Sequence, residues 1–149
     1  MKVILLDIDG VLATEETSRL PVHQLYAYPF DKECVNVFNM ILKQTDAEIV
    51  LSSDWRLMYN NDLEIIDEVF KHNGVLKSPI EVTPNYGDRE KDILKYIEIN
   101  ASRIKNFLIL DDLDLNIYQE NFIRCNINNG LLQDGILEKA TSILTKEKI

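Results

Sequence analysis

The alternation of short apolar runs with stretches of helical periodicity restricts this chain to a small group of folds. Five apolar runs have the length of strands, and four stretches between or after them repeat apolar residues every three or four positions. Strands that are buried on both faces are continuous apolar runs, as in a parallel sheet covered by helices on both sides. The order of these segments therefore predicts an α/β fold with a central, mainly parallel five-stranded sheet and right-handed crossovers.

The predicted elements can be placed along the chain by residue number. The expected strands, of which the third is the weakest, cover residues 3–7, 47–51, 80–82, 107–110 and 122–125. Asp31 and Asp88 are expected to cap the first and third helices, and the first helix runs to about Lys43. Gly74 closes the second helix in a left-handed conformation, and Gly130 precedes the last helix. The apolar positions that mark the four helices are Cys34, Val35, Phe38, Ile41 and Leu42, then Leu63, Ile66, Val69 and Phe70, then Ile93, Leu94 and Ile97, and finally Leu137, Ala140, Ile143 and Leu144.

Length and composition indicate one globular domain over residues 1–149. Hydrophobic residues make up 46% of the 149 positions and charged residues 28%, and no repeat or linker interrupts the pattern. The net charge of −9, without a dense basic run, argues against tight non-specific binding of nucleic acid but leaves room for a local basic groove. Cys34 and Cys125 fall in apolar patterns, so we expect both to be reduced core residues. The short N-terminal apolar run and the lack of a membrane-length segment predict a cytoplasmic protein with no membrane partner.

Polar side chains follow three of the predicted strands at the point where each strand ends. They are Asp7 and Asp9, Ser52 and Ser53, and Asp111 and Asp112. Ligands of open parallel sheets bind beyond the carboxyl ends of the strands, so these side chains are expected to meet in one crevice. Carboxylates gathered there would repel each other unless a cation lay between them. Magnesium, which prefers oxygen ligands from different segments, is the expected cofactor.

Residues 7–12, Asp-Ile-Asp-Gly-Val-Leu after an apolar strand, resemble the first motif of the haloacid dehalogenase (HAD) superfamily. The resemblance implies that Asp7 is the nucleophile that accepts a phosphoryl group and that Asp9 is the general acid and base. It also implies that the Asp7 side chain and the Asp9 backbone carbonyl ligate the metal. Gly10 would let the chain turn close to the site without a side chain in the way.

Two further motifs of the superfamily concern the substrate phosphate. A Ser or Thr after the second strand donates to a phosphoryl oxygen, and Ser52 matches this position better than Ser53. A Lys or Arg near the start of the helix before the fourth strand offsets the charge of nucleophile and phosphate. Arg89 and Lys91 both fit, and residues two apart on a helix do not face the same way. We favour Arg89, because it lies nearer the helix start and its fork can hold two phosphoryl oxygens.

The acids after the fourth strand resemble the last motif of the superfamily. In this motif one acid binds magnesium and the other orients the site. Spacing from the strand favours Asp112 as the closer ligand and Asp111 as its supporting neighbour, while Asp114 reads as a solvated loop acid. The resemblance as a whole implies a three-layer Rossmann-like HAD fold. The segments after Leu12 and after Ser53 are too short to hold an inserted cap domain.

A finer resemblance links the chain to the HAD domains of Swiss army knife RNA-repair proteins. It rests on residues 49–56, which contain Ser-Asp-Trp-Arg, on Arg89 followed by Ile93, and on residues 110–112 and 130–131. It implies removal of phosphate from RNA or other polynucleotide ends. Arg56 would then grip a phosphate, and Trp55 would either stack on a base or belong to the core. Residues 14–30 contain His23, Tyr26, Tyr28 and Phe30. These side chains would either form a flap over the open crevice or pack on the sheet edge.

The function expected from the sequence is magnesium-dependent hydrolysis of a phosphomonoester through a phospho-Asp7 intermediate. The substrate would be a small phosphometabolite, a nucleotide or an RNA or DNA end, and the oligomeric state stays open. The alternative is a non-enzymatic phospho-acceptor or binding module with a receiver-like acidic site. Asp9 favours the enzyme, since a second acid two residues after the nucleophile serves turnover. A degenerate interaction domain is a third hypothesis, although all four polar positions keep competent side chains.

Overall fold

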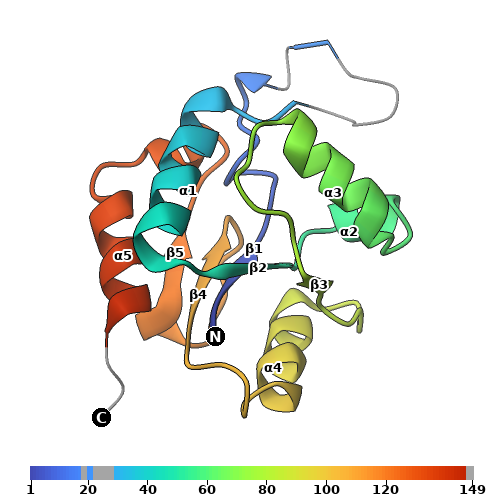
Figure 1. Cartoon of the computed structure of the whole chain (residues 1–149), viewed down its shortest axis with the longest axis vertical. Helices are drawn as coiled ribbons and strands as arrows, with labels where there is room; N and C mark the ends of the chain where they lie inside the picture. The colour runs from blue at the N-terminus through green and yellow to red at the C-terminus, as the bar shows by residue number, and fades with distance from the viewer. Residues whose placement is uncertain (18–19, 22–28, 147–149) are drawn as a thin grey trace.

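The computed structural model describes residues 1–17, 20–21 and 29–146, and it has the α/β architecture expected from the sequence. Strands and helices alternate along the chain, and Figure 1 shows the strands in the middle of the molecule with helices around them. The elements are β1 (Lys2–Leu6), α1 (Lys32–Thr45), β2 (Glu48–Leu51), α2 (Trp55–Met58), α3 (Leu63–His72), β3 (Glu81–Val82), α4 (Arg89–Ile99), β4 (Asn106–Asp111), β5 (Phe122–Arg124) and α5 (Ile136–Thr145), with 3-10 turns at Gln119–Asn121 and Gly130–Leu132.

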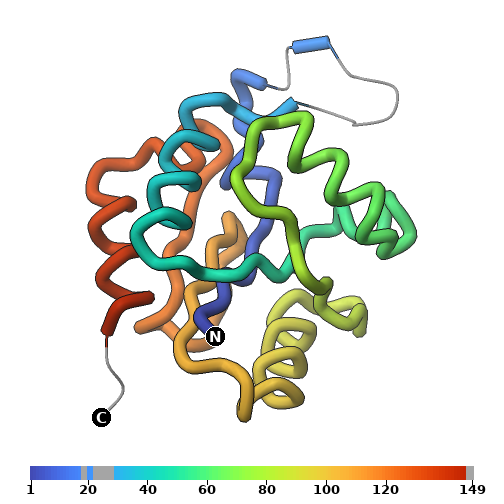
Figure 2. The backbone as a smooth tube through the Cα atoms, in the orientation of Figure 1, coloured from blue at the N-terminus to red at the C-terminus, as the bar shows by residue number. Residues whose placement is uncertain are grey.

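The five strands form one parallel sheet in the order β3-β2-β1-β4-β5. Figure 2 follows the path of the chain, in which β1 is the centre and the later strands are added on either side. The prediction of a parallel sheet is therefore confirmed. Because β1 is flanked by β2 and β4, the carboxyl ends of these three strands lie next to each other at one edge of the sheet.

Side chains of the sheet alternate between two separate apolar layers. Helices α1, α3 and α5 cover one face, where Ile4 and Leu6 of β1 are buried among their side chains. Helix α4 covers the other face, where Val3 and Leu5 pack with Ile93 and other apolar residues of that helix. In Figure 1, α1 and α5 lie side by side and α4 lies away from them. The two layers explain why β1, β2 and β4 are apolar along most of their length.

Helix ends follow the expected capping chemistry. The Asp31 carboxylate accepts from two backbone amides of α1, and Asp88 caps α4 in the same way through one amide. Gly74 has a φ of 77°, as expected for the left-handed residue after α3. Asp62, which the apolar pattern did not single out, caps α3. The strong local preference of Asp for such positions is what made the other caps predictable.

Two details differ from the sequence-based expectations. A short helix, α2, begins at Trp55 soon after β2, and its four residues are too few to show a helical period in the sequence. Leu63 of α3 and Leu94 of α4, both expected on the apolar face of their helix, are each 38% exposed, while Tyr96 of α4 is buried. Gly130 precedes the last helix as expected, with a 3-10 turn at Gly130–Leu132 before α5 begins at Ile136.

Cys34 and Cys125 are free and buried, and burial raises the pKa of their thiols to about 11 and about 12.

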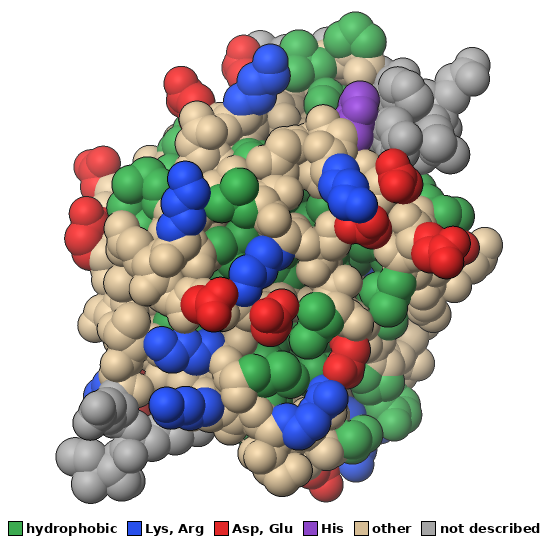
Figure 3. Space-filling view, viewed as in Figure 1, with side chains coloured by type: hydrophobic (Ala, Val, Ile, Leu, Met, Phe, Trp, Pro, Cys, Tyr) green, Lys and Arg blue, Asp and Glu red, His purple; other side chains and the backbone are tan. Residues whose placement is uncertain are grey.

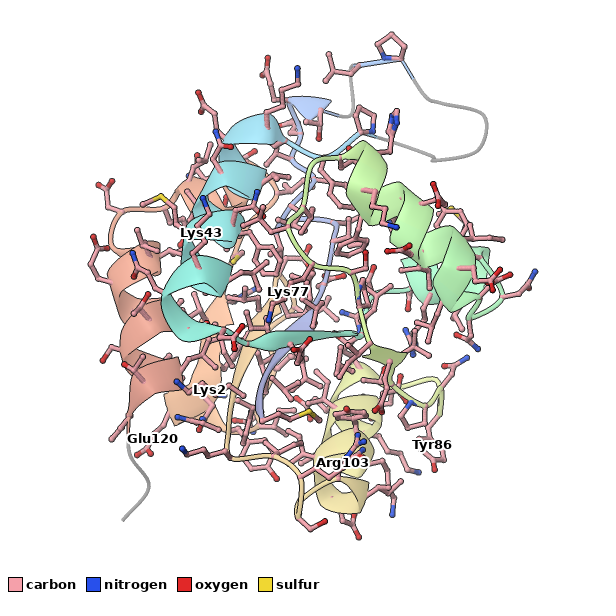
Figure 4. The ribbon with its side chains drawn as sticks, viewed as in Figure 1. Lys2, Lys43, Lys77, Tyr86, Arg103 and Glu120 are labelled. Atoms are coloured by element: carbon pink, nitrogen blue, oxygen red, sulfur yellow. The ribbon has the colours of Figure 1, made fainter. Side chains whose placement is uncertain are left out.

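Positive and negative side chains are interspersed on the face seen in Figure 3. Figure 4 shows Lys77 in front of β2, where its ammonium donates to the backbone carbonyl of Ala47 at 3.0 Å. Within the described part of the chain, no helix is both long and apolar enough to cross a membrane.

Candidate active site

Four polar residues form a row across the carboxyl ends of β4, β1, β2 and β3. In this order they are Asp111, Asp7, Ser52 and Thr83, and all four are buried. The backbone amides of Asp7, Ser52 and Thr83 each donate to a carbonyl of the neighbouring strand, at 2.9, 3.0 and 3.0 Å. Residues in register on parallel strands point to the same face of the sheet. The row therefore continues the face that α4 covers, and it brings Asp7, Ser52 and Asp111 to one edge of the sheet.

Three carboxylates of this edge lie close enough to share one cation. Oxygen atoms of Asp7, Asp111 and Asp112 all lie within 4.8 Å of one another. Burial, followed by the neighbouring Asp111 carboxylate, raises the pKa of Asp7 well above its usual value. Burial also raises the pKa of Asp111, although Arg89 opposes this shift. The carboxylates are thus held together against their own repulsion, as expected for a set of oxygen ligands for a hard divalent ion.

The Arg89 guanidinium lies beside two of these acids. Its Nη1 atom is 2.6 Å from Oδ2 of Asp111 and 3.5 Å from Oδ2 of Asp7. Burial lowers the pKa of Arg89, but the charges of Asp7 and Asp111 outweigh burial, and the net shift is upward. Arg89 is the first residue of α4, which brings its side chain over the ends of β1 and β4.

Lys91, the other cation weighed for this role, points elsewhere. Its side chain is exposed, and its ammonium lies 5.5 Å from the centre of the Tyr86 ring. Tyr86 itself is 52% exposed, and Figure 4 places it at the outer side of the loop between β3 and α4. Of the two cations, the structure therefore brings Arg89 to the carboxylates.

The Asp112 side chain packs directly against Gly10. A Cβ atom built on Gly10 would lie 2.6 Å from the Asp112 Cβ and 2.7 Å from its Oδ2, which is a clash. Gly10 also has a φ of 81°, in the left-handed region. Asp111 is engaged on both sides, by Arg89 and by the backbone amide of Leu113 at 3.0 Å. The expectation that Asp112 is the closer metal ligand and Asp111 its support stays a prediction, since both acids belong to the same group of carboxylates.

Asp9 is the exposed acid of the first motif and lies outside the three-carboxylate group of the described residues. Its Oδ2 accepts a hydrogen bond of 3.1 Å from Nε1 of Trp55. Trp55 is 3% exposed and packs against Phe30, with ring centroids 5.6 Å apart. Trp55 thus belongs to the core rather than to a base-stacking surface, and it holds Asp9 from α2. The metal contact expected of the Asp9 backbone carbonyl stays a prediction.

The two serines after β2 have different surroundings. The Ser52 hydroxyl is buried and has no hydrogen-bond partner among the described residues, and the same holds for the hydroxyl of Thr83 in the next strand. The Ser53 hydroxyl accepts from the backbone amide of Trp55 at 3.2 Å and so helps to begin α2. A buried polar group without a partner requires an explanation. A phosphoryl oxygen would supply the partner that Ser52 lacks, in line with the preference for Ser52.

Arg56 does not have the surroundings expected for a phosphate ligand. Its side chain is 1% exposed, and every nitrogen of the guanidinium donates to a protein group. The acceptors are the backbone carbonyls of Ser52, Ser53, Thr83 and Pro84 and the carboxylate of Asp92. The expected phosphate contact of Arg56 is therefore corrected to an internal one. The motif pattern could not reveal this, because Asp92 lies far away in the sequence and reads as an ordinary helix acid.

Phe30 is one of the four residues expected to form a flap over the crevice or to pack on the sheet edge. Phe30 is 3% exposed and packs edge-on against Phe70 at 5.5 Å, so it belongs to the core. His23, Tyr26 and Tyr28 lie outside the described residues.

Comparison with known proteins identifies the family of the chain. The family model for the HAD domain in Swiss Army Knife RNA repair proteins matches residues 3–136, which run from the second residue of β1 to the first residue of α5. No curated protein and no solved structure shows significant similarity to the chain.

Proposed function

Because this chain belongs to the family of HAD domains in Swiss Army Knife RNA repair proteins, we propose that it is a magnesium-dependent phosphomonoester hydrolase that works through a phospho-Asp7 intermediate. The family itself supports a phosphoesterase of the HAD type. The observation that carries the finer proposal is the group of Asp7, Asp111 and Asp112, whose oxygens lie within 4.8 Å of one another beside Arg89.

The donor set fits magnesium. All three side chains offer hard oxygen ligands from two segments, and water and a substrate phosphate would complete an octahedral shell. Asp7 and Asp112 would hold the ion directly, with Asp111 oriented by Arg89 beside them. When bound, magnesium would neutralise the carboxylates and polarise a phosphoryl oxygen.

Asp7 has the position that a nucleophile needs. Its Oδ1 accepts from the backbone amide of Ile8 at 2.9 Å, which fixes the carboxylate and leaves Oδ2 on the side of Arg89. A carboxylate oxygen would form a bond to phosphorus while the ester P–O bond breaks. Arg89 would offset the charge of nucleophile and phosphate, and the Ser52 hydroxyl would donate to a phosphoryl oxygen.

Asp9 would move the protons of both half-reactions. In the first, its carboxylic acid donates a proton to the leaving oxygen. In the second, its carboxylate takes a proton from a water molecule that attacks the phospho-aspartate, which releases phosphate and restores Asp7. The hydrogen bond from Trp55 would hold the Asp9 side chain in one place during both steps.

The proposed substrates cover several classes of phosphomonoester. We include small phosphometabolites, nucleotides and polynucleotide ends, and the name of the family gives RNA ends a place among them. The net charge of −9 argues that an RNA substrate would be held by local contacts at its phosphorylated end rather than by a broad basic surface.

The test is a screen of phosphorylated metabolites, nucleotides and oligonucleotides with 3′- or 5′-phosphates, with and without magnesium. Magnesium-dependent release of inorganic phosphate that Asp7→Asn abolishes is the expected result. Mass spectrometry of acid-quenched protein should show the phosphoryl group on Asp7 during turnover. Stable phosphorylation of Asp7 without turnover would instead establish the receiver-like acceptor, and wild-type protein that neither releases phosphate nor becomes phosphorylated would contradict both functions.

A further inference from the structure

A buried ion pair joins α2 to α4 beneath the active-site edge. Nη2 of Arg56 lies 3.0 Å from Oδ2 of Asp92, and the two side chains are 1% and 4% exposed. Transfer of both charges from water is costly, and apolar side chains of similar volume often stabilise a protein as well or better. The pair therefore calls for a role that apolar packing could not fill.

Arg56 binds the backbone that carries the active-site hydroxyl. Nη1 donates to the carbonyls of Ser52 and Ser53, both at 2.9 Å. Nε donates to the carbonyl of Thr83 and Nη2 to that of Pro84, both at 3.3 Å. The planar fork of one guanidinium thus sets the spacing between the end of β2 and the end of β3.

Asp92 binds the segment that carries the active-site cation. Its Oδ1 accepts from the backbone amide of Tyr86 at 2.6 Å, in the loop that leads into α4. Asp92 lies three residues after Arg89 on the same helix, one turn further along. The position of the first turn of α4 is thus tied to Arg56, and through Arg56 to Ser52.

We propose that Arg56 and Asp92 form a positioning pair that fixes the Ser52 hydroxyl relative to the Arg89 guanidinium. This inference rests on the proposed phosphatase function, in which Ser52 and Arg89 contact the phosphoryl group. Contacts to a transferring group are strongest in the transition state, and small displacements of their donors reduce the rate steeply. Neither Arg56 nor Asp92 needs to touch the substrate for this effect.

The kinetic test uses Arg56→Lys and Asp92→Asn. A lysine ammonium keeps the charge but cannot reach the carbonyls on both sides of the fork. We expect each variant to lower kcat at least about tenfold and to change KM by less than about threefold. Adding Arg56→Lys to Ser52→Ala should reduce kcat by much less than it does in the wild-type background, because the two residues act through one contact.

Asn106→Ala is the matched control for general destabilisation. Asn106 is buried at the other end of β4, where its amide donates to the carbonyls of Ile143 and Lys146. The variant should lower the melting temperature as Arg56→Lys does and leave kcat within about twofold. If Arg56→Lys also keeps kcat within twofold, or if Asn106→Ala lowers kcat equally, the pair is structural and the inference is overturned.

A measurement without turnover separates this inference from the proposed function. The NMR signal of the Arg89 Nη–H groups, of which Nη1 pairs with Asp111, reports this ion pair whether or not a substrate is known. Arg56→Lys should shift and broaden this signal, and Asn106→Ala should leave it unchanged. An unchanged signal in Arg56→Lys overturns the inference, even if no phosphatase activity is found. If Arg56→Lys shifts the signal but the wild-type protein has no phosphatase activity, the positioning role is supported and the proposed function fails.

Discussion

The indole Nε1 of Trp55 donates a hydrogen bond of 3.1 Å to the Asp9 carboxylate, which connects α2 to the loop after β1. Asp9 is exposed, so without this bond its side chain would be free to rotate in solvent. The bond selects one orientation for the acid that we propose as proton donor and acceptor.

Trp55→Phe should therefore slow catalysis more than it destabilises the fold. Phenylalanine keeps an aromatic ring against Phe30 but removes the donor. We expect kcat to fall about tenfold and the free energy of unfolding to fall by about 1–2 kcal/mol. Steady-state kinetics and urea denaturation measure the two effects. Phe30→Leu, which disturbs the packing but leaves the donor, should cost similar stability and keep most of the activity; the opposite ranking would refute the role of the bond.

Asp7→Asn should abolish turnover while the fold persists. The amide cannot form the acyl phosphate, so kcat should fall by about 10³-fold or more. Circular dichroism should show unchanged secondary structure. Asp114→Asn is the control, because Asp114 is an exposed acid beside the same edge of the sheet. Near-full activity in Asp7→Asn would overturn the nucleophile assignment.

Arg89→Ala and Lys91→Ala should differ strongly. Arg89 lies 2.6 Å from Asp111 and 3.5 Å from Asp7, whereas Lys91 lies over the exposed Tyr86 ring. We expect Arg89→Ala to lower kcat/KM by about 10²-fold, as for loss of one preorganised donor, and Lys91→Ala to stay within about twofold. Equal losses in the two variants would show that both cations serve the phosphate.

Metal-free protein should lose stability as the pH rises. The pKa of Asp7 is raised in the folded state by burial and by Asp111, so ionised Asp7 favours unfolding. The free energy of unfolding should fall as the pH rises from about 3.9, the unfolded value, through the raised folded pKa. Asp7→Asn should flatten this slope and stabilise the metal-free protein at pH 7. Urea denaturation with EDTA between pH 4 and 8 measures the slope, and a stability that rises over this range in wild type alone would contradict the argument.

Magnesium affinity should depend on the absence of a side chain at Gly10. Gly10→Ala would strain a left-handed residue and push the new Cβ into Asp112, which it would meet at 2.6 Å. Gly74→Ala is the matched control, since Gly74 has a similar φ of 77° and open space around it. Both variants should lose about 1–2 kcal/mol of stability from backbone strain. Only Gly10→Ala should weaken magnesium binding, by about tenfold or more in a titration calorimeter; equal affinities in both variants would remove Asp112 from the ligand set.

The order of elements could be predicted, and the candidate site residues could be named, because the signals are local. Continuous apolar runs marked β1, β2 and β4, and Asp31 and Asp88 marked the starts of α1 and α4. The parallel arrangement then required the residues after the strands to meet at one edge. Short elements escaped, because the four residues of α2 are too few to show a helical period.

Sequence alone determined the strand and helix order, the motif of residues 7–12 and the set of polar strand ends, since each depends on neighbouring residues. Tertiary structure alone decided between Arg89 and Lys91, gave Trp55 its bond to Asp9, and turned Arg56 inward to Asp92. These outcomes depend on distances between segments far apart in the chain. Periodicity and spacing report which side of an element a residue occupies, but not which distant group it meets when the layers pack.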